Sequence, residues 1–247
     1  MAKASQSLKK PISSDLKGLF QPQAVLEAPS LDQKSLSALQ EKMLSRVKGC
    51  NNPANKDFFS GFRDLPALSL DHKKAIKVAA DFRKQFKRLL VLGTGGSSLG
   101  SKAVIDCFAK NCDREVFFIE ILDTFDLPEL KKAELKKTAV VAISKSGSTL
   151  ETLLSLSYFE EQFSKAGLKI KKHFIAISDA DANPAADTKN SLRLWAHNRD
   201  VTILDMHPSI GGRWSVSTSV GIFPIAFAGL NAKKFISAFE ESFSKTP

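Results

Sequence analysis

The chain has 247 residues, of which 43% are hydrophobic and 25% are charged, a balance typical of a soluble folded domain. No apolar run approaches the roughly 20 residues that a membrane span needs, so we expect no membrane partner. The net charge of +10 lies almost wholly within residues 1–90, where basic residues are mixed with acidic and apolar ones. That pattern favours a solvated helical surface over a nucleic-acid interface, and it also fits a weak field that steers an anionic substrate.

The three cysteines, Cys50, Cys107 and Cys112, are odd in number and form no Cys-x-x-Cys pair. We therefore expect reduced thiols and a cytoplasmic protein, because disulfides persist mainly in oxidising compartments. The amino-terminal stretch has no continuous apolar region of the kind found in signal peptides. The four histidines show no ligand-like spacing with the cysteines, so we expect no metal site.

The first third of the chain predicts helices without strands. Residues 1–30 contain Ser, Lys and Pro with weak periodicity, and we expect a mobile segment there. Apolar residues recur at helical spacing over 31–47 and again over 70–86, with a break at 49–53. Residues 31–88 are thus predicted to form a helical N-terminal extension that precedes the first strand.

From Leu89 onward, short apolar runs alternate with helical patterns, which is typical of a parallel sheet covered by helices on both faces. Strands are predicted at 89–93, 116–122, 139–144, 173–178 and 201–206, and helices at 99–110, 127–136, 149–166 and 185–198. The expected fold class is α/β, a doubly wound parallel five-stranded sheet of flavodoxin-like type over 89–206, with the helical N-terminal extension before it.

Residues 207–247 follow the last predicted strand. A Pro- and Gly-containing loop covers 208–214, and a nearly all-apolar helix is predicted over 215–230, broken or kinked near Pro224. Apolar residues four apart (Phe235, Phe239 and Phe243) then predict a final amphipathic helix.

A glycine turn joins the first strand to its helix. Gly93-Thr94-Gly95-Gly96-Ser97-Ser98 follows the apolar run 89–92 and precedes a helical pattern that begins near Leu99. Glycines allow close approach of a ligand to the backbone, and the helix start offers unpaired N–H groups. The turn therefore predicts an anion site, most simply for phosphate.

The third strand ends in a second loop of this kind. Hydroxyl side chains follow it at 144, 146, 148 and 149, and a helical pattern begins directly afterwards. Such a loop can surround phosphate oxygens with hydroxyl and backbone donors. The alternative is ordinary helix capping, because Ser148 and Glu151 have capping-box spacing. For Glu151 itself we favour capping, but that pattern leaves Ser144 and Ser146 unexplained.

Topology brings the two loops together. In a sheet of order 2-1-3-4-5, strands 1 and 3 are neighbours, and ligands bind beyond their carboxyl ends at the switch point. The pair of loops predicts one phosphate-binding crevice. It disfavours a nicotinamide-binding domain, because Ser98 occupies the place of the third glycine in that fingerprint and the hydroxyl-rich loop would have no purpose there. The P-loop sequence pattern is absent.

Three motifs resemble the glucose-6-phosphate isomerase family, also called the phosphoglucose isomerase family. They are Gly95–Gly100, Ser144–Thr152 and Gly211-Gly212-Arg213-Trp214-Ser215-Val216, and their order and rough separations also fit. The first two motifs belong to the wider sugar-isomerase (SIS) phosphosugar-binding fold. The Gly-Gly-Arg motif before an apolar helix is the part that is specific to the isomerases.

The resemblance implies a role for each matching residue. Ser144, Ser146 and Thr149 would hold the sugar phosphate through their side chains, helped by the Lys145 backbone N–H. Gly96 and Ser97 would line the sugar. Arg213 would lie near carbons 1 and 2, where a guanidinium can stabilise the negative charge of a cis-enediolate. The alternative for Arg213 is a salt bridge that braces its loop.

The implied activity is interconversion of glucose 6-phosphate and fructose 6-phosphate without a metal or nucleotide cofactor, in a family that is commonly homodimeric. Trp214 stands where the family usually has Phe or Tyr, and Ser148 where it often has Thr. The family's catalytic glutamate, histidine and lysine belong to a second domain, and no residue here matches those motifs. We therefore expect an amino-terminal portion of an isomerase, and we interpret His207, although it is near Arg213 in sequence, as a structural residue.

Two alternatives stay open. The chain could be a non-catalytic SIS module that binds a phosphosugar without turnover, because proton transfer needs a positioned base that these motifs do not supply. A nucleic-acid-binding protein would instead show salt-sensitive binding to DNA or RNA through its basic first third.

Overall fold

The computed structural model describes residues 33–50, 71–120, 129–179 and 190–244. The chain forms two compact units, residues 1–55 and 56–247. In the first unit a single described helix, α1 (Gln33–Cys50), lies where the helical spacing predicts one. The segment 1–30, for which mobility is expected, lies outside the described residues. Across the described ranges, no helix is both long and apolar enough to cross a membrane.

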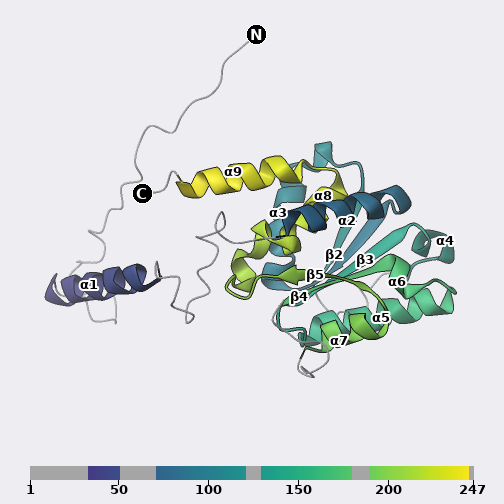
Figure 1. The fold of residues 1–247 in the computed structure, drawn as a ribbon, viewed down its shortest axis with the longest axis horizontal. Coiled ribbons are helices and arrows are strands. Elements are labelled where there is room, and N and C mark those ends of the chain that lie inside the picture. Colours follow the sequence, from purple (N-terminus) through teal and green to yellow (C-terminus); the bar gives the residue numbers. More distant parts are fainter. Residues whose placement is uncertain (1–32, 51–70, 121–128, 180–189, 245–247) are drawn as a thin grey trace, which may run out of the picture. The chain divides into compact units, whose positions relative to one another are not determined.

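The second unit is built on a five-stranded, all-parallel sheet (Figure 1). Its strands are β1 (Arg88–Leu92), β2 (Glu115–Ile119), β3 (Thr138–Ile143), β4 (Phe174–Asp179) and β5 (Thr202–Met206). Their order is β2-β1-β3-β4-β5, with β1 paired in register to both β2 and β3. The predicted doubly wound α/β fold and its 2-1-3-4-5 order are confirmed.

The composition of the strands explains their order in the sheet. β3 and most of β1 and β4 are buried on both faces, and they are near-continuous runs of Leu, Val, Ile and Ala. β2 and β5 lie at the two edges of the sheet, and in both strands exposed residues are interspersed with half-buried or buried ones. Continuous apolar runs suit the covered centre of a parallel sheet, whereas strands with one wet side belong at its edges.

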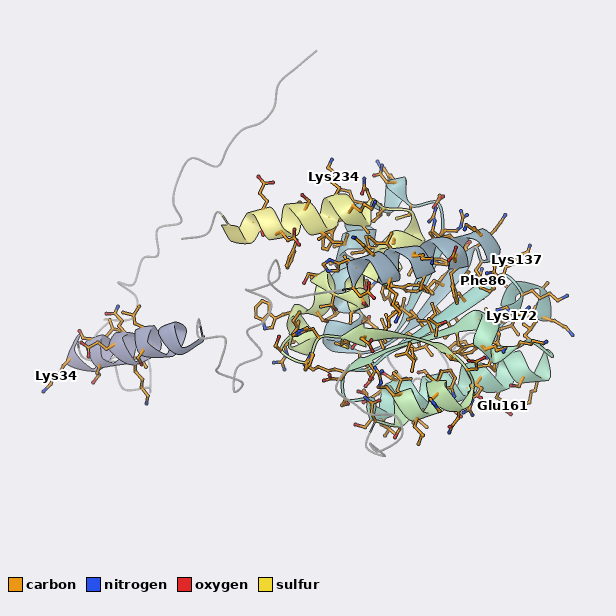
Figure 2. The ribbon with its side chains drawn as sticks, viewed as in Figure 1. Lys34, Phe86, Lys137, Glu161, Lys172 and Lys234 are labelled. Carbon is orange, nitrogen blue, oxygen red and sulfur yellow. The ribbon has the colours of Figure 1, made fainter. Side chains whose placement is uncertain are left out.

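Helices cover the two faces of the sheet in separate layers (Figure 1). One core cluster joins α2 (His72–Gln85), α3 (Leu99–Cys107) and α8 (Ser219–Ala228) to alternate strand positions. The other joins α4 (Lys132–Leu135), α5 (Leu150–Lys165) and α7 (Ser191–Asn198) to the remaining positions. Of the residues labelled in Figure 2, Phe86 is buried in the interior, whereas four charged residues lie at the surface: Lys137, Glu161, Lys172 and Lys234.

The helices differ from their predicted bounds mainly at their ends. α3 stops at Cys107, and a 3-10 turn, η4 (Ala109–Asn111), follows it. α4 and α7 are shorter than predicted, and the residues before them are partly outside the described ranges. The helices predicted over 215–230 and near Phe235–Phe243 correspond to α8 and α9 (Ala232–Ser244). A short helix, α6 (Ile170–His173), was not predicted.

The all-apolar helix begins later than predicted and is not broken at Pro224. Residues Gly212–Ser217 form a 3-10 helix, η5, and Thr218 is extended. The Thr218 hydroxyl then accepts a hydrogen bond from the Val220 N–H, which starts α8 at Ser219. α8 continues through Pro224 to Ala228, where Gly229 ends it in the left-handed region with a φ of 101°.

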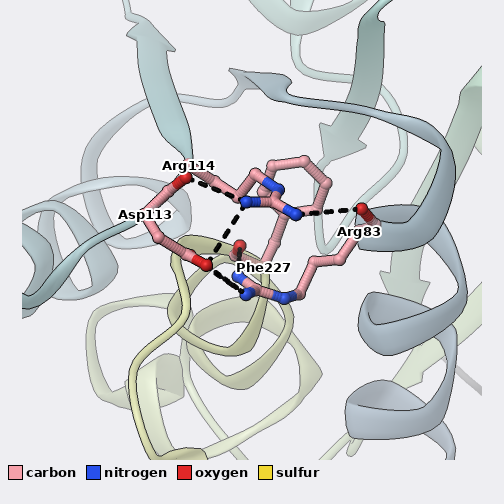
Figure 3. A network of polar contacts seen from close by, with 4 residues as sticks. All are labelled: Arg83, Asp113, Arg114 and Phe227. Atoms are coloured by element: carbon pink, nitrogen blue, oxygen red, sulfur yellow. Dashed lines mark hydrogen bonds and ion pairs between the residues drawn. The ribbon is translucent and has the colours of Figure 1, made fainter.

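A polar network holds the carboxyl end of α8 (Figure 3). The Arg83 guanidinium donates to both carboxylate oxygens of Asp113, at 3.0 and 2.9 Å, and to the Phe227 carbonyl at 2.5 Å. Arg114 donates to the carbonyl of Asp113 at 3.0 Å. Because cations favour the negative end of a helix dipole, Arg83 stabilises α8 while joining it to α2 and to the entry of β2. These contacts hold the carboxyl end of α8, the helix that follows η5.

Candidate functional site

The loop after β1 forms a compact 3-10 turn, η3 (Gly95–Ser97), at the carboxyl edge of the sheet. Gly95 has a φ of +56°, which a side chain rarely adopts, and this explains glycine at that position. The buried Ser98 hydroxyl donates to a Glu120 carboxylate oxygen at 2.5 Å, and Glu120 directly follows β2. The turn is therefore held from the neighbouring strand, and of its glycines Gly96 lines the cleft.

The loop after β3 is organised by its own hydroxyls. The hydroxyls of Ser144 and Thr149 share a hydrogen bond of 2.8 Å, and the Gly147 N–H donates to Ser144 Oγ at 3.1 Å. Ser144 is only 1% exposed, whereas Ser146 is exposed and Thr149 half-buried. Ser146 and Thr149 thus line the accessible side of the loop, while the buried Ser144 bonds the Thr149 hydroxyl from behind.

The capping box predicted for Ser148 and Glu151 is wrong. Thr149, not Ser148, is the N-cap residue of α5, and no side chain makes the capping hydrogen bond there. Ser148 instead donates from its N–H and its hydroxyl to Ser146 Oγ, at 3.3 and 3.1 Å. The first N–H groups of a helix have no partner within it, so α5 directs its positive end toward this loop without a capping side chain.

Two buried residues that the sequence motifs miss support the same loop. The Ser178 hydroxyl, at the end of β4, donates to the Ser144 carbonyl at 2.8 Å and accepts from Asn190 Nδ2 at 2.9 Å. A Cβ on Gly147 would lie 1.8 Å from Asn190 Oδ1, and Gly147 has a φ of +68°. Asn190 also caps α7 by accepting from the Arg193 N–H. An Asn before an apolar helical pattern is the capping signal that could have identified it.

The Gly-Gly-Arg segment packs directly on the glycine turn. A Cβ on Gly96 would come within 2.3 Å of the Gly212 carbonyl oxygen and 2.7 Å of the Arg213 nitrogen. The Ser215 hydroxyl lies within hydrogen-bond distance of two carbonyls, Gly212 at 2.6 Å and Gly96 at 3.3 Å. Only a residue without a side chain fits at 96, and η5 is thereby seated on η3. Two segments more than 100 residues apart form one wall of the site.

The Lys145 side chain ties the third loop to this wall. Its Nζ donates to the carbonyls of Pro208 and Ile210, each at 2.6 Å. The sequence motifs assign a role only to the backbone of Lys145, so this bridge is a further finding. In the same segment, His207 Nδ1 bonds the hydroxyl of Ser209 at 2.8 Å and its N–H at 3.3 Å. His207 stabilises its own turn, which agrees with the structural interpretation of this residue.

The three loops enclose an open cleft of about 700 Å³ at the carboxyl edge of the sheet. It is lined by Thr94, Gly96, Ser97, Lys145, Ser146, Thr149, Asp179, Gly211, Gly212, Arg213 and Trp214. Six of the seven predicted site residues line it. The seventh, Ser144, does not, because it is buried behind Thr149. Asp179 and the half-exposed Trp214 were not predicted to be at the site.

Arg213 reaches this cleft as an exposed side chain. No ion pair or hydrogen bond joins its side chain to another described residue, so the alternative of a loop-bracing salt bridge has no support within those ranges. A second hollow, of about 550 Å³, lies at the opposite edge near the start of β1, β2 and β3. There Arg88 pairs with Glu115 at 2.9 Å and with Glu134 at 3.2 Å, which indicates a structural salt-bridge cluster.

The cleft has the features of an anion site with a separate cationic end. Its lining combines Ser146 and Thr149, at the start of α5, with Arg213 from η5. α3 and α5 leave their strands toward opposite faces of the sheet, so the cleft lies at the topological switch point. Among the described residues, no group of three or more His, Cys, Asp or Glu could hold a metal ion.

Comparison with known proteins gives a consistent match. Residues 74–238 match the family model described as phosphoglucose isomerase. The glucose-6-phosphate isomerase of Carboxydothermus hydrogenoformans is 31% identical over 243 residues, which cover 92% of this chain and 50% of that protein. The enzyme of Chlamydia felis is 35% identical over 169 residues, covering 65% of this chain and 30% of that one. The chain thus spans half or less of the length of these relatives.

Solved structures show the same fold at low sequence identity. A hypothetical protein from Thermus thermophilus aligns with a TM-score of 0.67 and 23% identity, over 87% of this chain and 50% of that chain. A glucose-6-phosphate isomerase from Chlamydia trachomatis aligns with a TM-score of 0.62 and 24% identity, over 87% and 46%. The structural likeness supports the fold, and the family match covers all five strands, most of the helices around them and all three loops. This chain belongs to the phosphoglucose isomerase family.

Proposed function

We propose that the cleft binds a phosphorylated sugar and takes part in the interconversion of glucose 6-phosphate and fructose 6-phosphate. The observation that carries the proposal is the seating of η5 on the glycine turn, with Gly96 against Gly212 and Arg213. This contact puts an arginine and a hydroxyl-rich helix start on one cleft. A sugar phosphate has a dianionic end and a reacting end several bonds away, and the cleft offers a matching group for each.

The phosphate end belongs at the loop after β3. Ser146 and Thr149 supply hydroxyl donors, and the start of α5 supplies N–H groups and the positive end of its dipole. Ser144 does not contact the phosphate in this proposal. It holds the Thr149 hydroxyl in place from behind, which refines the role that the sequence motif implies.

The reacting end belongs near Arg213. Moving the carbonyl between carbons 1 and 2 requires removal of a proton, and the resulting enediolate carries negative charge on its oxygens. A guanidinium held at that position stabilises the charge as it develops, because it offers fixed donors in a planar fork. Arg213 lines the cleft and no described side chain neutralises it, so its donors are available to a ligand.

A second candidate function is phosphosugar binding without turnover. Proton transfer between adjacent carbons needs a positioned base, and the ionisable side chains among the described residues of the cleft lining are Lys145, Asp179 and Arg213. Neither His nor Glu is among those lining residues. This set suits ligand binding and charge stabilisation better than a complete proton relay.

Calorimetric titration tests the binding site. We expect fructose 6-phosphate to bind the wild-type chain and unphosphorylated fructose to bind far more weakly. The double variant Ser146→Ala/Thr149→Ala should lose at least tenfold in fructose 6-phosphate affinity, because each hydrogen bond to a charged group contributes about 1.5–3 kcal/mol. The matched control is Ser164→Ala, at an exposed position near the other end of α5. Equal affinity of the double variant and the control would refute the phosphate site.

A solvent-exchange experiment separates the two candidates. Fructose 6-phosphate is incubated with the chain in deuterated water, and proton NMR follows glucose 6-phosphate formation and deuterium entry at carbons 1 and 2. Interconversion by the wild-type chain that Arg213→Ala loses supports the isomerase. Binding without exchange or interconversion supports phosphosugar binding without turnover by this chain itself, and would place the proton-transferring base outside it.

A further inference from the structure

The 3-10 helix that presents Arg213 is attached at its far end to α2 by a histidine. His72 is the first residue of α2, and its predecessor Asp71 caps that helix by accepting from the Lys74 N–H at 3.0 Å. The half-buried His72 ring places Nε2 2.7 Å from the Ser217 carbonyl oxygen. A carbonyl oxygen only accepts, so Nε2 carries the proton and donates.

Ser217 is the last residue of η5, where a helix leaves its carbonyl groups without partners of its own. Thr218, the next residue, is extended, and its hydroxyl donates to the Ser215 carbonyl at 2.7 Å. The Ser217 carbonyl faces away to α2 and finds its donor in His72. Both the 2.7 Å distance and the burial of Ser217 indicate a strong contact.

η5 is held at several places on its short length, and in its second half Val216 packs against Gly100 of α3, where an added Cβ would lie 2.8 Å from Val216 Cβ. Near its start, Gly212 and Arg213 lie on Gly96, and the Ser215 hydroxyl reaches the Gly96 carbonyl. At its end, His72 holds the Ser217 carbonyl. Arg213 and Trp214, which line the cleft, lie within the first anchored stretch, residues 212–215, and precede the His72 contact at Ser217. The first anchor is the glycine motif itself, whereas the His72 contact comes from a helix that precedes the sheet in sequence.

We propose that His72 is a positioning residue that fixes η5, and with it the Arg213 guanidinium, relative to the phosphate loop. This inference rests on the proposed function, because it assumes that Arg213 meets the reacting end of a phosphosugar. A cationic group stabilises developing charge most when it is already in place and does not reorganise. Loss of the His72 donor frees the end of η5 and lets Arg213 sample orientations that do not meet the ligand.

The test compares two ligands that use different parts of the cleft. Inorganic phosphate reports on the loop after β3 alone. 5-Phosphoarabinonate, a phosphorylated sugar acid, adds a planar carboxylate that carries negative charge where the enediolate would. The ratio of the two affinities therefore measures what Arg213 contributes. Both are titrated against the 247-residue chain with the substitution Trp195→Phe, so that Trp214 is its one tryptophan and its fluorescence reports on η5.

Three variants distinguish a role of His72 in positioning η5 from a general role in folding. His72→Phe keeps an aromatic ring without the donor, and His72→Gln keeps an N–H donor near the position of Nε2. His197→Phe is the matched control, because His197 is exposed on α7. We expect His72→Phe to lose about tenfold in affinity for 5-phosphoarabinonate, the effect of one hydrogen bond, with an unchanged affinity for inorganic phosphate. His72→Gln should recover most of the loss, and His197→Phe should behave as the parent. If His72→Phe fails to fold, His72→Ala carries the same expectation.

The outcomes distinguish the two proposals. If the parent chain bound 5-phosphoarabinonate no better than inorganic phosphate, the proposed function would fail, and the role of His72 with it. If the parent discriminates and His72→Phe discriminates equally well with unchanged Trp214 emission, the positioning role alone is overturned. Equal losses for both ligands in His72→Phe would also overturn it, because they would indicate general destabilisation of the cleft.

Discussion

Arg213 has the surroundings expected of a side chain that binds an anionic ligand. It lines the cleft as an exposed cation, and no ion pair joins it to the rest of the described chain. We predict that Arg213→Ala lowers 5-phosphoarabinonate affinity by one to two orders of magnitude, and that Arg213→Lys recovers only part, because an ammonium cannot contact two oxygens in the fork geometry of guanidinium. Calorimetry measures both variants. Arg199→Ala, on the surface beyond α7, is the control, and an equal loss there would contradict the assignment.

Asn190 offers a second test at single-residue resolution. Its side chain both caps α7 and donates to Ser178, which holds the Ser144 carbonyl. Asn190→Ser keeps an N-cap acceptor but loses the reach to Ser178, whereas Asn190→Ala loses both. We predict that both variants weaken inorganic phosphate binding several-fold, and that only Asn190→Ala also lowers the free energy of unfolding by about 1 kcal/mol more. Urea denaturation and phosphate titration check this; a phosphate affinity equal to wild type in both variants would exclude the supporting role.

Sequence reasoning at this scale finds the residues of a motif better than their contacts. The spacing at 144, 146 and 149 identifies the loop, but it cannot reveal that Ser144 is buried behind Thr149. It also assigns Ser148 and Glu151 to a capping box that does not form, because the Ser148 hydroxyl bonds Ser146 instead. Which local hydrogen bond forms depends on tertiary contacts at the loop. Here those contacts come from Ser178, on β4, and from Asn190, at the start of α7.

At the scale of elements, the site depends on two 3-10 turns packed backbone to backbone. A Cβ on Gly96 would lie 2.3 Å from the Gly212 carbonyl, whereas a Cβ on Gly212 has no heavy atom within 4 Å. We predict that Gly96→Ala separates η5 from η3, lowers the free energy of unfolding by about 1–3 kcal/mol and abolishes measurable 5-phosphoarabinonate binding. Gly212→Ala should leave stability nearly unchanged. Thermal unfolding and calorimetry check both, and a Gly96→Ala chain as stable as wild type would contradict the packing argument.

The elements divide into those that local patterns specify and those that tertiary contacts create. β1, β3 and β4 are recognisable because buried parallel strands are continuous apolar runs. η5 is not recognisable in this way: residues 215–217 fall at the start of the helix predicted over 215–230, yet the packing of Gly212 on Gly96 and the extended Thr218 impose a separate turn. Its geometry is fixed by a partner more than 100 residues away.

At the scale of the whole second unit, a parallel sheet covered on both sides lets distant segments meet at one edge. β1 and β3 are adjacent, and α3 and α5 leave them toward opposite faces, so their loops converge. α8 extends from η5 at the cleft to the Arg83–Asp113 network at its other end (Figure 3). Alternating strands and helices are compatible with the common order 2-1-3-4-5, and that order brings the two phosphate-type loops to one crevice, which is why the sequence predicts the cleft before any contact is known.

The same covered sheet makes the stability of the fold depend on pH through His173. This residue is 8% exposed, its ring lies 4.8 Å from that of Phe86 and 5.1 Å from that of Phe163, and Nδ1 donates to the Thr138 carbonyl at 2.9 Å. Burial lowers the pKa of His173 below its ordinary value of 6.5, an effect to which nearby Lys172 adds. Below pH 6.5 the unfolded chain therefore binds a proton that the folded chain does not, so the free energy of unfolding falls as the pH falls.

We predict that the contribution of His173 to the free energy of unfolding is fully present above pH 6.5. Below that pH it declines, by less than about 1.4 kcal/mol per pH unit, until the pH reaches the pKa of His173 in the folded chain. Urea unfolding between pH 5 and 8 measures the slope. His173→Asn keeps a donor near Nδ1 but cannot titrate, so the variant is expected to be less stable throughout and to show a shallower slope below pH 6.5. His197→Asn, exposed on α7, should keep the wild-type slope. A slope in His173→Asn as steep as in the wild type would assign the acid sensitivity to other groups.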